Sequence, residues 1–324
     1  MHATRRLVVG ALCAAAFAAP ASAQTTVTIT HALSLDSHYG AGSQSFKDTV
    51  ERLTQGRFRV NIQRNDNERE AIEATQIGTQ EFTITSTGPL GNFVREVLVL
   101  DIPFLFRDYA HARGVLDGPI GQDLLARFPA RGLIGVAWME NGFRNLTNSR
   151  REVATPADVQ GLKIRTMENQ VHMRAFQTLG ALPTPMAFSE LVPALQQGTV
   201  DGQENPIPVI VANNLNQVQR FLSLTRHVYS PAVLIANPAF WNRLNAQDRV
   251  AFQEAAKAAV QANRERVTLD EQRGVALLRE RGMTVRTDVD TAAFQAALAP
   301  AFEHYNRHFD GALIARIRDW KPGS

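Results

Sequence analysis

Residues 161–206 read GLKIRTMENQVHMRAFQTLGALPTPMAFSELVPALQQGTVDGQENP and hold the most informative pattern in the chain. Arg165 ends a short strand-like run, Phe188 precedes a capped helix, and Asn205 lies beside a proline just after a glycine turn. A guanidinium, an aromatic ring and a carboxamide can converge on one small anion. Arginine suits such a site because its planar fork pairs with a carboxylate through two hydrogen bonds and its charge is permanent.

The first 23 residues have the pattern of a secretion signal. Arg5 and Arg6 precede an apolar run from Leu7 to Ala19, and the small residues 21–23 form a cleavage site. The apolar run is shorter than the roughly 20 residues that span a bilayer. We therefore expect cleavage after Ala23 and a periplasmic location for the mature protein.

Charge and cysteine content exclude several classes of function. Loss of the signal removes Arg5 and Arg6, so 34 − 2 = 32 basic residues face 31 acidic residues, and the formal net charge falls from +3 to +1. The chain has no basic block with interleaved aromatic residues, so no nucleic-acid partner is expected. Cys13 is the only cysteine and leaves with the signal, which excludes a disulfide, a thiolate nucleophile and a thiolate metal site.

Strand-like and helix-like runs alternate after residue 24 and predict an α/β fold. The expected strands cover residues 27–31, 58–63, 82–86, a short piece of 97–106, 132–139, 162–164, 232–237 and 283–286. The expected helices cover residues 40–55, 68–78, 110–128, 246–281 and a segment from 291 onward.

The helix expected at 246–281 is long enough to serve two domains. At 1.5 Å per residue it spans roughly 54 Å, whereas a small domain is about 30 Å across. We expect lobe I to hold residues 24–141 plus 231–270, and lobe II to hold residues 142–230 plus 271–324. Several chain crossings between two lobes make a hinge and a cleft, and clefts between domains are favoured sites for small ligands.

The chain resembles the solute-binding proteins of tripartite ATP-independent periplasmic (TRAP) transporters, of the dicarboxylate-receptor type. The pieces GLKIR, LGALPTPMAFSEL and ALQQGTVDGQENP follow one another at the spacing of that family. EREAIEATQIGT, STGPL and LDIPFLF match upstream, and VQRFLSLTRHVYS matches downstream. The resemblance covers nearly the whole mature chain. It implies two α/β lobes with a hinge, an interdomain cleft and a long helix spanning both lobes.

The resemblance also implies which residues contact a ligand. Arg165, the arginine of GLKIR, would pair with a ligand carboxylate, and Arg144 would face the carboxylate or a second polar group. Asn205 would hydrogen-bond the ligand and Phe188 would pack on its body. Other positions aligned with or next to polar ligand contacts are His31, Asn67, Glu68, Ser86 and Asn141.

Ordinary structural roles are alternatives for the principal candidates. Arg165 has Glu168 and Asp201 as possible internal ion-pair partners. Asn205 suits a turn before proline, and Phe188 suits a hydrophobic core.

One position departs from the family pattern, and two neighbours of Asn205 stay open. The family often has tyrosine where this chain has Val192, so a hydroxyl and an aromatic face are missing there. A ligand identity taken from members with that tyrosine therefore does not transfer. Gln203 and Glu204 either shape the turn or reach the ligand.

The chain lacks the sequence motifs of the common catalytic sites. It contains no GxSxG, HExxH, GxxxxGK[ST] or CxxC. We expect a periplasmic receptor that captures a small carboxylate, such as a C4-dicarboxylate, a hydroxy or oxo acid, or a sugar acid. The resemblance implies delivery to a TRAP membrane permease, with no metal or cofactor, and we expect a monomer. The alternatives are an exported organic-acid lyase or hydrolase and a membrane-docked adaptor.

Overall fold

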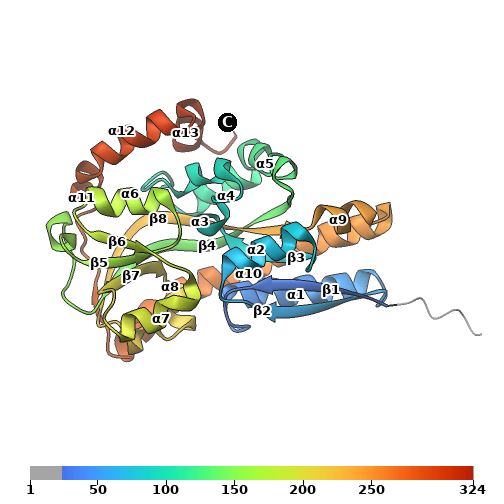
Figure 1. The fold of residues 1–324 in the computed structure, drawn as a ribbon, viewed down its shortest axis with the longest axis horizontal. Helices are drawn as coiled ribbons and strands as arrows, with labels where there is room; N and C mark the ends of the chain where they lie inside the picture. The colour runs from blue at the N-terminus through green and yellow to red at the C-terminus, as the bar shows by residue number, and fades with distance from the viewer. Residues whose placement is uncertain (1–23, 324) are drawn as a thin grey trace, which may run out of the picture.

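The computed structural model describes residues 24–323 (Figure 1). The expected signal peptide and its cleavage after Ala23 lie outside the described residues. Within residues 24–323, no helix combines the length and the apolar character needed to cross a membrane.

The described strands form one mixed sheet in the order β2-β1-β3-β8-β4-β7-β5-β6, with β9 beside β8. Their bounds are β1 Thr25–His31, β2 Phe58–Arg64, β3 Phe82–Ser86, β4 Ile134–Asn148, β5 Lys163–Thr166, β6 Leu182–Pro185, β7 Gly202–Pro206, β8 Phe221–Ala236 and β9 Thr284–Arg286. β1 pairs in parallel with β2 and β3, and β5 pairs in parallel with β6 and β7. The long antiparallel strands β4 and β8 connect these two groups.

The strands β1 to β3 with their helices form one half of the molecule, and the strands β5 to β7 with theirs form the other. β4 and β8 run through both halves, and their pairing changes register between them. β8 borders β3 over residues 232–236, whereas β4 borders β7 over residues 144–148. The β4·β8 pairing shifts at three places, one of them between Glu140 and Gly142. Gly142 has φ 125°, a conformation that favours glycine. Since a β-bulge bends its strand, the shared strands bend between the two halves.

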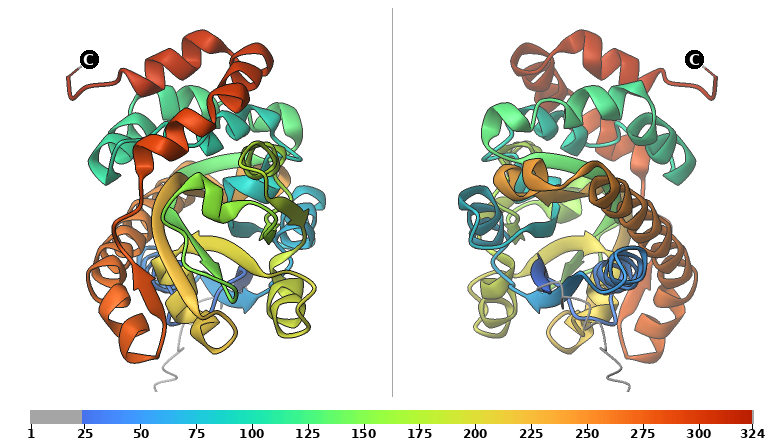
Figure 2. Two further views of the ribbon diagram at one scale, coloured as in Figure 1. Left: turned by 90° about the vertical axis from the view of Figure 1, so that its left-hand side faces the viewer. Right: turned by 90° about the vertical axis from the view of Figure 1, so that its right-hand side faces the viewer.

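Helices cover both faces of this sheet (Figure 2). The α-helices are α1 His38–Leu53, α2 Glu68–Ile77, α3 Thr87–Leu90, α4 Tyr109–Asp117, α5 Pro119–Leu125, α6 Gln170–Thr178, α7 Phe188–Gln196, α8 Ile207–Ala212, α9 Pro238–Arg243, α10 Ala246–Glu280, α11 Thr291–Ala297, α12 Ala299–His308 and α13 Gly311–Arg318. Short 3₁₀ helices are η1 Arg95–Asp101, η2 Pro129–Arg131, η3 Pro156–Val159 and η4 Leu215–Gln217.

The long helix α10 contacts elements of both halves. Its 35 residues correspond to about 52 Å at 1.5 Å per residue. The Asn245 side chain caps its start by accepting a hydrogen bond from the Asp248 amide at 2.8 Å. The helix packs against α1 and β4 and also against α8 and β9, and Figure 2 shows it running along one side of the molecule.

The C-terminal helices close the molecule over α4. The two Arg107 Nη atoms donate to the carbonyls of Arg318 at 2.6 Å and Trp320 at 2.8 Å. His111 Nε2 lies 2.8 Å from the Ile317 carbonyl. The largest apolar core therefore joins η1, α4 and α5 to α6, α12 and α13.

Three local expectations are wrong. Residues 95–101 form η1 instead of a strand, because an apolar run that is buried on all sides suits a tight helix as well as a strand. Residues 110–128 form two helices, since Gly118 is extended and Pro119 starts α5. Asn205 lies within strand β7 and not in a turn.

Candidate ligand-binding site

A small pocket with a cavity volume of about 20 Å³ lies between the two halves. Lining residues from the elements around β1 to β3 and from β4 are Ala32, Leu33, Tyr39, Glu68, Ser86 and Asn141. Lining residues from the elements around β5 to β7 are Arg165, Met167, Phe188, Asn205 and Val209. Residues far apart in the chain thus form one small cavity, as expected of a cleft between lobes.

Arg165 presents a buried guanidinium to this pocket. It lies on β5 and is 2% exposed. Nε and Nη2 donate to the Met186 carbonyl at 3.1 and 2.8 Å, whereas Nη1 has no hydrogen-bond partner among residues 24–323. The guanidinium carbon lies 5.9 Å from the centre of the Phe188 ring. Burial, followed by repulsion from Arg144, lowers the pKa of Arg165 to about 10.

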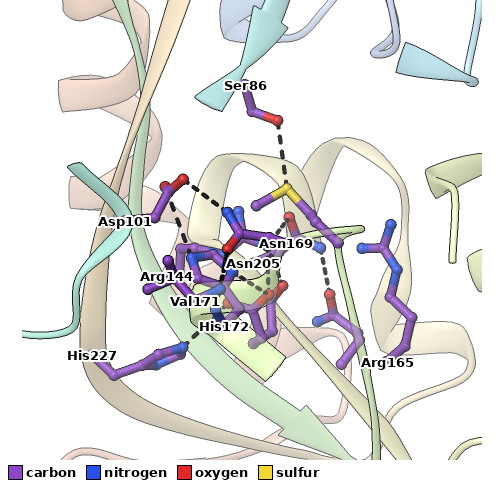
Figure 3. A network of polar contacts seen from close by, with 12 residues as sticks. Ser86, Asp101, Arg144, Arg165, Asn169, Val171, His172, Asn205 and His227 are labelled. Carbon is purple, nitrogen blue, oxygen red and sulfur yellow. Dashed lines mark hydrogen bonds and ion pairs between the residues drawn. The ribbon is translucent and has the colours of Figure 1, made fainter. Parts of the chain in front are cut away.

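The internal ion pairs considered for Arg165 are absent from the described part of the chain. Asp201 instead accepts from Arg150 Nε at 2.6 Å and from the Lys163 amide at 2.9 Å. Glu168 contributes only a longer-range charge effect on Arg165. Figure 3 shows the Arg165 side chain apart from the dashed contacts around Arg144.

Arg144 lies outside the pocket lining, and Glu204 neutralises its charge. It is fully buried on β4. Its Nε donates to Glu204 Oε2, and its Nη2 donates to Glu204 Oε1 at 2.9 Å. Nη2 also donates to Asn205 Oδ1 at 3.2 Å. Burial alone would raise the pKa of Glu204, but the charge of Arg144 and the adjacent His172 hold it well below its usual range. Arg144 thus orients Asn205 and is not among the pocket-lining residues.

Asn205 has a fixed orientation in the pocket wall. Its Nδ2 donates to Gln203 Oε1 at 2.5 Å, while its Oδ1 accepts from Arg144. Gln203 in turn donates to Thr147 Oγ1 at 2.8 Å. The carboxamide keeps one N–H that these contacts do not use, so it can donate to an anion beside Arg165. Glu204 and Gln203 therefore support Asn205 from within the sheet.

Glu68 and Ser86 face Arg165 from the other half of the molecule. Glu68 starts α2, and its Oε1 accepts from Thr85 Oγ1 at 2.9 Å and from the Ser86 amide at 2.8 Å. The Ser86 hydroxyl lies 3.0 Å from the same oxygen. These donors hold the carboxylate in place, so the pocket has a cationic wall and an acidic wall.

Besides Arg144, two predicted contact residues lie outside the pocket lining. His31 Nε2 is 3.1 Å from Ser43 Oγ, and burial lowers the His31 pKa to about 4. Asn67 caps α2, because its Oδ1 accepts from the Glu70 amide at 3.3 Å. Their roles in binding stay predictions. Asn141 does line the pocket, and its Oδ1 lies 3.3 Å from His38 Nε2.

Several lining residues carry no signal in the sequence. Tyr39, Met167 and Val209 have the spacing of ordinary helix or loop residues, and nothing in their local sequence indicates a ligand contact. Val192 is half-buried on α7 against an apolar core and lies outside the lining set. Within the described residues, no group of three or more His, Cys, Asp or Glu side chains is arranged to hold a metal ion.

Comparison with known proteins identifies the family. The chain matches the model of the bacterial extracellular solute-binding proteins, family 7, over residues 29–308, and it belongs to that family. It is 50% identical over 317 residues to a solute-binding protein of Verminephrobacter eiseniae, covering 97% of this chain and 95% of the relative.

Two solved structures are similar along most of the chain. A TRAP periplasmic solute-binding protein from Polaromonas sp. JS666, bound to D-erythronate, has 52% identity and a TM-score of 0.90, and the match covers 92% of this chain and 99% of that one. A TRAP periplasmic solute-binding protein from Bordetella bronchispeptica, with density assigned as pantoate, has 51% identity and a TM-score of 0.90, and the match covers 92% and 100%.

These comparisons confirm the predicted class. The chain is a TRAP-type solute-binding protein with the expected two-lobed α/β fold, and it is a receptor rather than an enzyme. The alternative of an organic-acid lyase or hydrolase is not supported.

Proposed function

We propose that this protein captures a small hydroxylated monocarboxylate and delivers it to a TRAP membrane permease. The observation that carries the proposal is the Arg165 guanidinium, which is 2% exposed and has no ion-pair partner within residues 24–323. A buried charge without a counter-charge is costly. Met186 occupies the edge formed by Nε and Nη2, so the end formed by Nη1 and Nη2 is available for both oxygens of a ligand carboxylate.

Glu68 supports a ligand with a single carboxylate. It lines the pocket opposite Arg165, and its charge acts on that guanidinium. A second carboxylate on the ligand would meet this negative charge, and like charges at close range in a buried site repel strongly. Hydroxyl groups, by contrast, donate to a carboxylate. The acidic wall therefore favours hydroxy acids over C4-dicarboxylates.

The ligands of the two similar structures support the same ligand class. D-erythronate and pantoate are both four-carbon-backbone acids with one carboxylate and hydroxyls on carbons 2 and 4. The proteins that hold them share about half of their residues with this chain. We infer that an acid of this size and pattern is captured here, without a metal or cofactor.

Closure of the two lobes completes the proposed mechanism. We assign residues 24–141 plus 231–270 to lobe I and residues 142–230 plus 271–324 to lobe II. Ser86 Oγ lies 3.4 Å from Met167 Sδ across the pocket, and Asn92 Nδ2 donates to the Glu168 carbonyl at 2.8 Å. Such contacts belong to a closed arrangement, and a ligand favours it only by binding it more tightly than the open one.

The partner and the location follow from the same proposal. The protein acts as a monomer in the periplasm after cleavage behind Ala23, and the closed complex is the form that the permease receives. Neither step requires nucleic acid or ATP binding by this chain.

Calorimetric titration of the mature protein tests the ligand class. D-erythronate or pantoate is expected to bind with micromolar or tighter affinity, about −8 kcal/mol or better, and to raise the melting temperature. Succinate is expected to bind at least tenfold more weakly, and Glu68→Gln should narrow that gap. Tighter binding of succinate than of both hydroxy acids by the wild-type protein would overturn the proposal.

A further inference from the structure

Tyr39 places a buried hydroxyl in the pocket wall. It lies in the first turn of α1, lines the pocket and is 2% exposed. Its Oη has no hydrogen-bond partner among residues 24–323. A buried hydroxyl without a partner costs about 1–3 kcal/mol, and buried polar side chains usually have partners. This hydroxyl is therefore positioned for a partner outside the chain.

The surroundings of Tyr39 hold its ring in place beside the pocket. The ring packs edge-on against His38 at 4.7 Å and His31 at 6.3 Å between ring centres. Asn141 holds His38 and Ser43 holds His31, so neither imidazole moves freely. Tyr39 and Glu68 both line the pocket, and burial, followed by the charge of Glu68, raises the pKa of Tyr39 well above its usual value.

We propose that Tyr39 Oη recognises one hydroxyl of the ligand by donating a hydrogen bond to it, while Glu68 accepts the proton of that hydroxyl or of its neighbour. A ligand hydroxyl has one donor and two acceptor sites. A phenol that donates and a carboxylate that accepts are complementary to it. This inference rests on the proposed function. It identifies Tyr39 as the lobe I residue that distinguishes ligands by the position of their hydroxyl groups.

The consequence is that the pocket discriminates against acids that lack the hydroxyl bound by Tyr39. A deoxy acid would leave Tyr39 Oη buried without a partner, and sites built to bind a substrate hydroxyl reject analogues that lack it. Arg165 contacts only the carboxylate of the ligand, so its contribution to binding does not change when the ligand hydroxyl is absent. Tyr39 thus separates hydroxy acids from simple carboxylates of the same length.

Tyr229 provides a matched control. It is also 2% exposed, and its Oη also lacks a partner among the described residues. It packs in an aromatic core against Phe106 and Phe143 and does not line the pocket. Tyr229→Phe therefore makes the same chemical change away from the ligand.

The test is a cycle that removes a hydroxyl from the protein and from the ligand. Wild type, Tyr39→Phe and Tyr229→Phe are titrated by calorimetry with D-erythronate and with its 2-, 3- and 4-deoxy analogues. Tyr39→Phe is expected to weaken D-erythronate binding about 10- to 100-fold, in line with a hydrogen bond to a buried polar group. The loss should shrink to less than threefold for the one analogue that lacks the contacted hydroxyl. Tyr229→Phe should leave every affinity within twofold of wild type.

The outcomes separate this inference from the function on which it rests. Unchanged D-erythronate affinity in Tyr39→Phe, or an equal loss for all four acids, overturns the role of Tyr39 and leaves the receptor function intact. Thermal melts of the unliganded variants establish that both are folded. A wild-type protein that binds none of the four acids overturns both proposals.

Discussion

Replacing Arg165 by methionine removes a charge from the pocket and keeps most of the side-chain volume. In the closed arrangement, burial lowers the Arg165 pKa from 12.5 to about 10. At 1.36 kcal/mol per pKa unit, this shift corresponds to about 3 kcal/mol of cost for holding the charged form in the closed pocket. In the proposed mechanism, opening of the lobes would let water reach the guanidinium and relieve that cost. The charge therefore disfavours closure without ligand by roughly a hundredfold in equilibrium constant.

We expect two opposite effects of Arg165→Met. The unliganded variant should populate the closed arrangement more than wild type does, and small-angle scattering should give it a smaller radius of gyration. Carboxylate binding should be lost, because the anchoring charge and its hydrogen bonds are gone. Calorimetry should then show at least a hundredfold weaker affinity. Arg174→Met, at an exposed position, should change neither quantity.

Either half of this expectation can fail separately. Wild-type affinity in Arg165→Met would show that the anchor is assigned to the wrong residue. Loss of binding with an unchanged radius of gyration would support Arg165 as the residue that binds the carboxylate. It would, however, refute the argument that the unpaired charge of Arg165 keeps the lobes apart.

Three further changes have calculable effects. Glu204→Gln leaves the fully buried Arg144 without its counter-charge, so urea titration should show a loss of about 3–5 kcal/mol in unfolding free energy, partly recovered in the Arg144→Met/Glu204→Gln double variant. Burial lowers the His38 pKa to about 3. Because this folded-state pKa lies below the unfolded value of 6.5, the stability contributed by neutral His38 is complete above pH 6.5. It decreases as the pH is lowered, and about 2 kcal/mol is lost at pH 5. In His38→Gln the stability difference between pH 7.5 and 5 should shrink by that amount, and an unchanged difference would contradict the assignment. Gly142→Ala should cost about 1–3 kcal/mol in thermal melts, since φ is 125° and the added Cβ would lie 3.0 Å from a proline side chain. Gly161→Ala, at φ 72° with open space around the Cβ, should cost less.

Local sequence signals predicted most of the fold. The expected helix at 246–281 appears as α10 at Ala246–Glu280, because an asparagine cap and a following glycine mark its ends. The first three strands were placed within two residues at each end, since alternation and glycine stops are local signals. Residues 95–101 were misassigned because burial on all sides removes the periodicity that separates a strand from a helix.

The candidate site was only partly visible in the sequence. Arg165, Phe188 and Asn205 lie together around the pocket, and their family motif had grouped them. The pairing of Arg144 with Glu204 depends on the antiparallel register of β4 and β7, in which Leu146 faces Glu204 and Arg144 faces Pro206. Such a register joins residues about 60 positions apart, and no local pattern encodes it.

The order of the strands in the sheet predicts slow folding during synthesis. β3 ends at residue 86, but its neighbour β8 supplies residues 232–236, and the carbonyls that bind Arg107 belong to residues 318 and 320. Contacts that are so distant in sequence form slowly, because the long loops between them must close first. A nascent chain therefore has no complete half to fold until most of it has left the ribosome. Since the family is extracellular, we expect such a delay to keep the polypeptide unfolded long enough for export.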